Sequence, residues 1–131
     1  MTNIDPLQRL IVSESQAVDR QELADLLAPY LTINKETKTF DFSSGFRDLS
    51  NANKILIILS AIKAKSLILG TEDKITPSEI IRMEVAPEGS IKTTLKTLFD
   101  SREIKSEKGK YYLPNYKLSQ VVARFKKTNS K

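Results

Sequence analysis

The apolar positions of this chain recur mostly with the three- and four-residue spacing of helices, interrupted by two short segments of β-prone residues. The strongest helix is predicted from about Asn51 to Leu69, after Ser50 as its N-cap and before Gly70 as its C-terminal stop. Its apolar side chains cover more than one helical face. Such a helix is expected at the centre of the core or between two packing layers.

Two shorter helices are predicted before this central one. The first covers about residues 6–15, where three apolar positions have helical spacing: Leu7, Leu10 and Ile11. The second begins after Asp19, which forms a capping-box pattern with Glu22. Its apolar side is formed by Leu23, Leu26, Leu27 and Tyr30. The sequence leaves open whether the polar stretch between the two is a break or a continuation of one helix.

A small hairpin is predicted over residues 31–42, because apolar, β-prone positions flank a polar segment that can turn. Residues 43–45 are expected to end it. The length of 131 residues suits one domain, or one domain with an appended element. We therefore divide the chain into an N-terminal element for possible oligomerisation, a C-terminal module and a flexible tail: 1–48, 49–127 and 128–131.

The segment Thr76-Pro77-Ser78-Glu79 fits a helix start at every position. Thr76 can cap the helix, Pro77 suits the first helical position, and Glu79 can reach back to the cap. This helix is expected to be short, since residues 85–89 have the composition of a turn.

A second amphipathic helix is predicted from about Ser90 to Asp100, with one apolar stripe at Ile91, Leu95, Leu98 and Phe99. Its opposite side carries lysines and hydroxyl groups, the residue types that reach phosphates and base edges. These candidate contacts are Ser90, Lys92, Thr93, Lys96 and Thr97. A merely solvated helix face would show the same spacing.

Residues 104–113 predict two short strands around Gly109, with three lysines near the tip: Lys105, Lys108 and Lys110. These lysines could also protect an edge strand from aggregation. A last helix is predicted over 118–127, with apolar positions at Leu118, Val121, Val122 and Phe125. The sequence leaves open whether it closes the core or forms a homodimer together with the helices of residues 6–30.

The composition excludes several kinds of site. The chain has no cysteine and no histidine, which excludes disulfides, zinc sites built from these residues and triads that need an imidazole base. Only four glycines are present, and none forms a phosphate-binding loop. We therefore expect a non-enzymatic protein without cofactor, metal or small-molecule ligand. The longest apolar run is far shorter than the ~20 residues of a membrane span, and the N-terminus lacks the order of a secretory signal. A cytoplasmic protein is expected.

The formal charge of +5 is unevenly distributed. Residues 1–70 carry 8 Lys and Arg against 8 Asp and Glu, whereas residues 71–131 carry 13 against 8. The whole excess therefore lies in the second half. A charge asymmetry of this kind predicts that this half faces a polyanion.

From Asn51 to Tyr116 the chain resembles the winged helix-turn-helix superfamily, in the order of a long helix, a short capped helix, a tight turn, an amphipathic helix and a basic hairpin. The resemblance implies an α+β fold, mainly helical, with an N-terminal helical extension. It also implies that the third helix enters the major groove of duplex DNA and that the hairpin, or wing, contacts the neighbouring backbone. The contacts it assigns are the helix and hairpin residues named above.

The expected function is accordingly that of a DNA-binding protein, acting as a transcriptional regulator or as a plasmid or chromosome accessory factor. The third helix lacks arginine, and Arg102 lies beyond its end. Because lysine reads guanine less well than arginine, the sequence specificity is expected to be modest. The alternative function is that of a protein-interaction module, an adaptor within a larger assembly.

Overall fold

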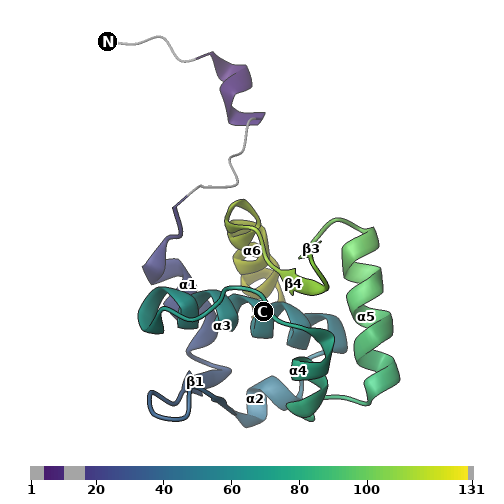
Figure 1. Ribbon diagram of the computed structural model, residues 1–131. Helices are drawn as coiled ribbons and strands as arrows, with labels where there is room; N and C mark the ends of the chain where they lie inside the picture. The colour runs from purple at the N-terminus through teal and green to yellow at the C-terminus, as the bar shows by residue number, and fades with distance from the viewer. Residues whose placement is uncertain (1–4, 11–16, 130–131) are drawn as a thin grey trace.

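The computed structural model describes residues 5–10 and 17–129 of the chain. These residues form six α-helices, two short 3-10 helices and two antiparallel hairpins (Figure 1). In chain order the elements are η1 (Pro6–Leu10), α1 (Arg20–Leu27), β1 (Leu31–Ile33), β2 (Phe40–Phe42), α2 (Ser44–Arg47), α3 (Asn51–Leu69), α4 (Pro77–Arg82), α5 (Glu88–Asp100), β3 (Lys105–Glu107), β4 (Lys110–Tyr112), η2 (Asn115–Lys117) and α6 (Leu118–Asn129). The predicted class, mainly α with short β-hairpins, is confirmed.

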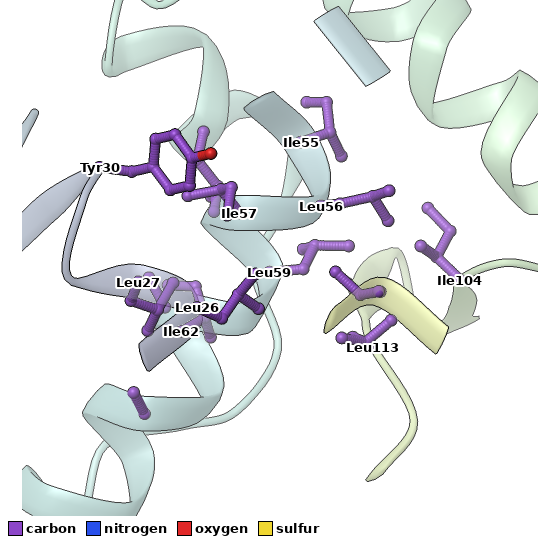
Figure 2. Packing of buried hydrophobic residues seen from close by; sticks show 14 of the residues in the cluster. Leu26, Leu27, Tyr30, Ile55, Leu56, Ile57, Leu59, Ile62, Ile104 and Leu113 are labelled. Atoms are coloured by element: carbon purple, nitrogen blue, oxygen red, sulfur yellow. The ribbon is translucent and has the colours of Figure 1, made fainter. Parts of the chain in front are cut away.

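The central helix α3 has the predicted bounds. The Ser50 hydroxyl accepts a hydrogen bond from the Asn53 backbone N–H, and Gly70 ends the helix in a left-handed conformation (φ 71°). All ten residues from Ile55 to Ala64 are buried, so this helix is covered on every side. Figure 2 shows its two packing layers, with residues of α1 and the following loop on one side and residues next to β3 and β4 on the other: Leu26, Leu27, Tyr30, Ile104 and Leu113.

The N-terminal part of the chain packs on this helix. Asp19 caps α1 through the Glu22 backbone N–H (3.0 Å), as predicted. α1 contacts both α3 and α6, and the Tyr30 ring meets Phe125 of α6 edge-on at 5.6 Å. The buried residues of 17–48 and of 49–127 thus form one cluster.

The helix predicted near the N-terminus and the tail predicted at the C-terminus both include residues outside the described ranges. Of the helix expected over about 6–15, only the 3-10 helix Pro6–Leu10 lies within them, and residues 11–15 lie outside. At the other end α6 continues to Asn129, so residues 128–129 of the expected tail are helical, and 130–131 lie outside the described part. The apolar stripe of α6 is buried, so this helix closes the core of the chain.

The first hairpin pairs Leu31 with Phe42, within the range predicted for it. Residues 43–45 do more than end it, because Ser43 caps the short helix α2. The Phe46 ring of α2 is buried and stacks on Phe42 at 4.2 Å. A helix of four residues is too short to show a periodic pattern of apolar residues in the sequence. The stacking of Phe46 on Phe42 stabilises α2.

The helix α4 has the predicted start, with both hydrogen bonds of the capping box between Thr76 and Glu79. The next helix, α5, begins at Glu88, two residues before the predicted start, because Pro87 occupies the N-cap position. Its stripe also differs from the prediction at one residue. Phe99 is 45% exposed, whereas the other three stripe residues are buried.

The second hairpin has a two-residue turn, Lys108–Gly109, with φ values of 52° and 79°. Positive φ at both positions is the type I′ geometry that fits the twist of a hairpin. The backbone of Tyr111 also exchanges two hydrogen bonds, of 2.8 and 3.0 Å, with Ile75, which precedes α4. This bridge fixes the hairpin to the helical part of the module.

Lys63 is a charged residue within the core, only 4% exposed. Its ammonium group donates a hydrogen bond to the Asn115 side-chain oxygen of η2. Burial lowers the pKa of Lys63 below its ordinary value of 10.5; the neighbouring Asp73 acts in the opposite direction, and Lys74 lowers the pKa further. The folded chain therefore holds this proton less tightly than the unfolded chain.

This shift predicts a pH-dependent contribution of Lys63 to stability. Since the unfolded chain binds more protons between the folded pKa and 10.5, the free energy of unfolding rises with pH in that window. We expect the parent chain to gain stability relative to Lys63→Met as the pH rises toward 10.5. Urea unfolding of both proteins at each pH measures the difference. A difference that does not change with pH would contradict the prediction.

Candidate nucleic-acid interface

α5 and the β3–β4 hairpin lie next to each other in the structure (Figure 1). The ring of Phe99 on α5 meets the ring of Tyr111 on β4 edge-on, with centroids 6.2 Å apart. Lys92, Lys96 and Phe99 lie at i, i+4 and i+7, so the two lysines share the helix face that leads to the hairpin. The structure therefore places the two predicted groups of contacts on adjoining elements.

The predicted contact residues of α5 are accessible to different degrees. Ser90 is half-buried at the start of the helix, and the other four are exposed. On the hairpin, Lys108 is exposed, whereas Lys105 and Lys110 are half-buried.

Both lysines of α5 are engaged in ion pairs along their own helix. The Lys92 ammonium lies 2.9 Å from a Glu88 carboxylate oxygen, and that of Lys96 lies 3.0 Å from Asp100. The hydrogen bond and the charge of Lys92 lower the pKa of the Glu88 carboxyl. With two acids and two lysines, α5 has no net charge of its own.

These pairs do not prevent contact with phosphate. All four side chains are more than half exposed, and ion pairs that are exposed to this degree contribute little to stability. A phosphate oxygen can therefore replace the carboxylate as the partner of either lysine at small cost.

The β3–β4 hairpin carries three lysines against one acid, Glu107, whereas the charges of α5 cancel. Lys110 pairs with Glu72 (2.6 Å), and Lys74 pairs with Glu107 of β3 (3.4 Å). The ammonium of Lys105 lies 5.5 Å from the centroid of the Tyr116 ring. Lys108, at the tip, forms no ion pair with any described residue.

Two cations near this surface occupy left-handed backbone positions. Lys108 has φ 52° in the hairpin turn, and Arg102 has φ 65° directly after α5. This backbone conformation is sterically unfavourable for residues that have a Cβ, and glycine or asparagine is usual there. Arg102 lies beyond the end of α5, as the sequence predicted, and it was not among the predicted contacts.

Other lysines have structural partners instead. The Lys54 ammonium donates to the Val85 carbonyl oxygen (3.0 Å), and that of Lys65 donates to the Lys38 carbonyl oxygen (3.0 Å). Among the described residues, no group of three or more acidic side chains could hold a metal ion. None of the helices within this part of the chain has the length and apolarity required to cross a membrane.

Comparisons with protein-family models, with curated proteins and with solved structures found no match to this chain.

Proposed function

We propose that the protein is a non-enzymatic DNA-binding protein of winged helix-turn-helix type, in which α5 lies in the major groove and the β3–β4 hairpin contacts the adjacent backbone. Its role would be that of a transcriptional regulator or of a plasmid or chromosome accessory factor. The succession of α3, α4, α5 and a basic hairpin supports the fold assignment. Ser90, Thr93 and Thr97 would add neutral hydrogen bonds to the lysine contacts.

The observation that carries the proposal is the position of Lys108. It stands at the tip of the hairpin, exposed, without an ion-pair partner among the described residues, and in a conformation that asparagine would adopt more readily. An exposed lysine at the tip of the hairpin that adjoins α5 can contact a phosphate without first leaving an ion-pair partner.

Replacing Lys108 with asparagine tests this explanation. The variant forms an Asn-Gly pair, the preferred sequence of a type I′ turn, so its stability is expected not to fall. Its affinity for duplex DNA is expected to decrease for every sequence, and the log–log salt slope to become shallower by about 0.9. Fluorescence anisotropy at several salt concentrations measures both, and thermal unfolding measures the stability.

Lys38→Asn is the matched control. Lys38 also has a positive φ (61°) in a hairpin turn and is exposed, but it belongs to the β1–β2 hairpin. The Lys38→Asn substitution is expected to leave the DNA affinity and the salt slope unchanged. Equal effects of the two substitutions would show that only the overall charge matters, and no effect of Lys108→Asn would remove the hairpin tip from the interface.

A second candidate function, a protein-interaction module, is favoured by an apolar groove on another face. The groove has a volume of about 360 Å³ and lies between α1, β1 and the end of α3, where Leu67 and Ile68 are 37% and 65% exposed. Leu7 and Leu10 of η1 are also exposed. The occupant proposed for the groove is η1 of a second copy, which gives a homodimer through the N-terminal segments. Such an apolar interface would depend little on salt, unlike a phosphate interface.

A further inference from the structure

A cavity of about 450 Å³ lies where the end of α5, the loop after it, β3 and η2 meet. Phe99 of α5 and Tyr116 of η2 both line it. Phe99 is 45% exposed although its spacing continues the buried stripe of the helix, and Tyr116 is half-buried. Accessible aromatic rings in a cavity offer a surface on which a planar group can stack.

The same cavity is strongly cationic, with three basic residues in its lining: Arg102, Lys105 and Lys117. The ammonium groups of Lys105 and Lys117 lie 5.5 and 6.0 Å from the centroid of the Tyr116 ring. Asp100 also lines the cavity and contributes one negative charge against three positive charges. The cavity thus combines aromatic surface with an excess of positive charge.

The backbone holds Arg102 firmly in this position. Its N–H donates to the Phe99 carbonyl oxygen (3.0 Å), and the next N–H, of Glu103, donates to that of Leu98 (3.0 Å). This is the Schellman pattern of a helix end, in which the left-handed residue is usually glycine. Here the position with φ 65° carries an arginine.

The cavity adjoins the candidate nucleic-acid interface. Phe99 continues the row of Lys92 and Lys96 along α5, and Lys105 belongs to the predicted hairpin contacts. A strand that follows the helix and the hairpin would therefore pass the cavity.

We infer that this cavity binds an unpaired nucleotide next to the duplex, with the base stacked on Phe99 and the phosphate held by Arg102, Lys105 and Lys117. The inference rests on the proposed DNA-binding function and specifies its substrate as DNA with a duplex–single-strand junction. Inside a duplex both faces of each base are covered by its neighbours. In the interior of an undistorted duplex an aromatic side chain therefore reaches no base face, whereas an unpaired nucleotide offers one.

The test compares two labelled probes, a blunt random-sequence duplex and the same duplex with a short deoxythymidine overhang. The parent chain is expected to bind the overhang probe about tenfold more tightly, since stacking of one base commonly contributes that much. Phe99→Leu keeps an apolar contact with Tyr111 but removes the stacking surface. Arg102→Gly removes the cation and at the same time relieves the left-handed conformation. Both are expected to lower this preference to about twofold or less, while the blunt duplex stays bound.

Lys38→Gly is the control for the arginine variant, since it also removes a cation at a positive φ (61°) but on the first hairpin. It is expected to keep the full preference. Thermal unfolding of Arg102→Gly is expected to show no loss of stability, so that a lost preference cannot come from unfolding.

The outcomes separate the inference from the function on which it rests. Equal binding of both probes by the parent chain, or an unchanged preference in Phe99→Leu, overturns the inference and leaves DNA binding standing. Binding of neither probe at low salt overturns the proposed function itself. If thymidine 5′-monophosphate alone binds in a Phe99-dependent way and the overhang adds nothing, the ligand is a free nucleotide and the strand assignment is wrong.

Discussion

Replacing Ile58 with alanine is expected to lower the free energy of unfolding by about 2–5 kcal/mol. Ile58 is 0% exposed at the middle of α3, within the stretch Ile55–Ala64 that is buried on all sides. Truncation there removes apolar contacts and leaves a cavity between packing layers that cannot easily collapse. Urea unfolding followed by circular dichroism measures the change.

The same helix provides a matched control. Ile68→Ala is the identical substitution at a side chain that is 65% exposed, and it is expected to change the free energy of unfolding by no more than about 0.5 kcal/mol. Equal losses for the two variants would contradict the central position of α3. Because the buried residues of the N-terminal and C-terminal parts form one cluster, Ile58→Ala is expected to shift a single cooperative transition.

Reversing three charges on the proposed interface is expected to reduce the affinity for duplex DNA by more than about tenfold at low salt. The variant carries Lys92→Glu, Lys96→Glu and Lys108→Glu. If each lysine contacts one phosphate, the log–log salt slope should become shallower by about 2.7, or 0.9 for each contact. Fluorescence anisotropy with labelled random-sequence duplex measures both quantities.

The variant needs a control for charge and one for folding. Reversing Arg20, Lys35 and Lys38 changes the net charge equally on exposed residues of α1 and the first hairpin and is expected to have a much smaller effect. The new glutamates on α5 face Glu88 and Asp100, and like-charge neighbours at this spacing cost about 0.2–0.5 kcal/mol each. The unfolding midpoint therefore has to stay close to that of the parent for the comparison to hold. Equal losses of affinity in the two triple variants would show that binding depends on the net charge of the protein and not on the proposed interface.

The parts of the fold that the sequence predicted well are those specified by local chemistry. Ser50 and Gly70 mark both ends of α3, and the Thr76 capping box marks the start of α4. The parts it missed depend on contacts between distant segments. α2 is held by the stacking of Phe46 on Phe42, and Phe99 leaves the buried stripe to line a cavity formed with η2.

The candidate site likewise has some features that the sequence could indicate and others that it could not. The spacing of Lys92 and Lys96 from Glu88 and Asp100 was visible in the sequence, and it could have indicated the ion pairs within α5. The pairing of Lys110 with Glu72 joins residues 38 positions apart, which no local pattern reveals. The left-handed conformation of Arg102 and its approach to Tyr116 likewise depend on how the chain turns after α5.

The measurement that tests the central proposal most directly is the titration of a labelled random-sequence duplex with the parent chain at several salt concentrations. We expect binding that weakens as salt increases, with a log–log slope of several multiples of about −0.9, and that is largely lost in the triple glutamate variant. No binding at low salt, or binding that does not depend on salt, would contradict the proposal that α5 and the β3–β4 hairpin contact DNA.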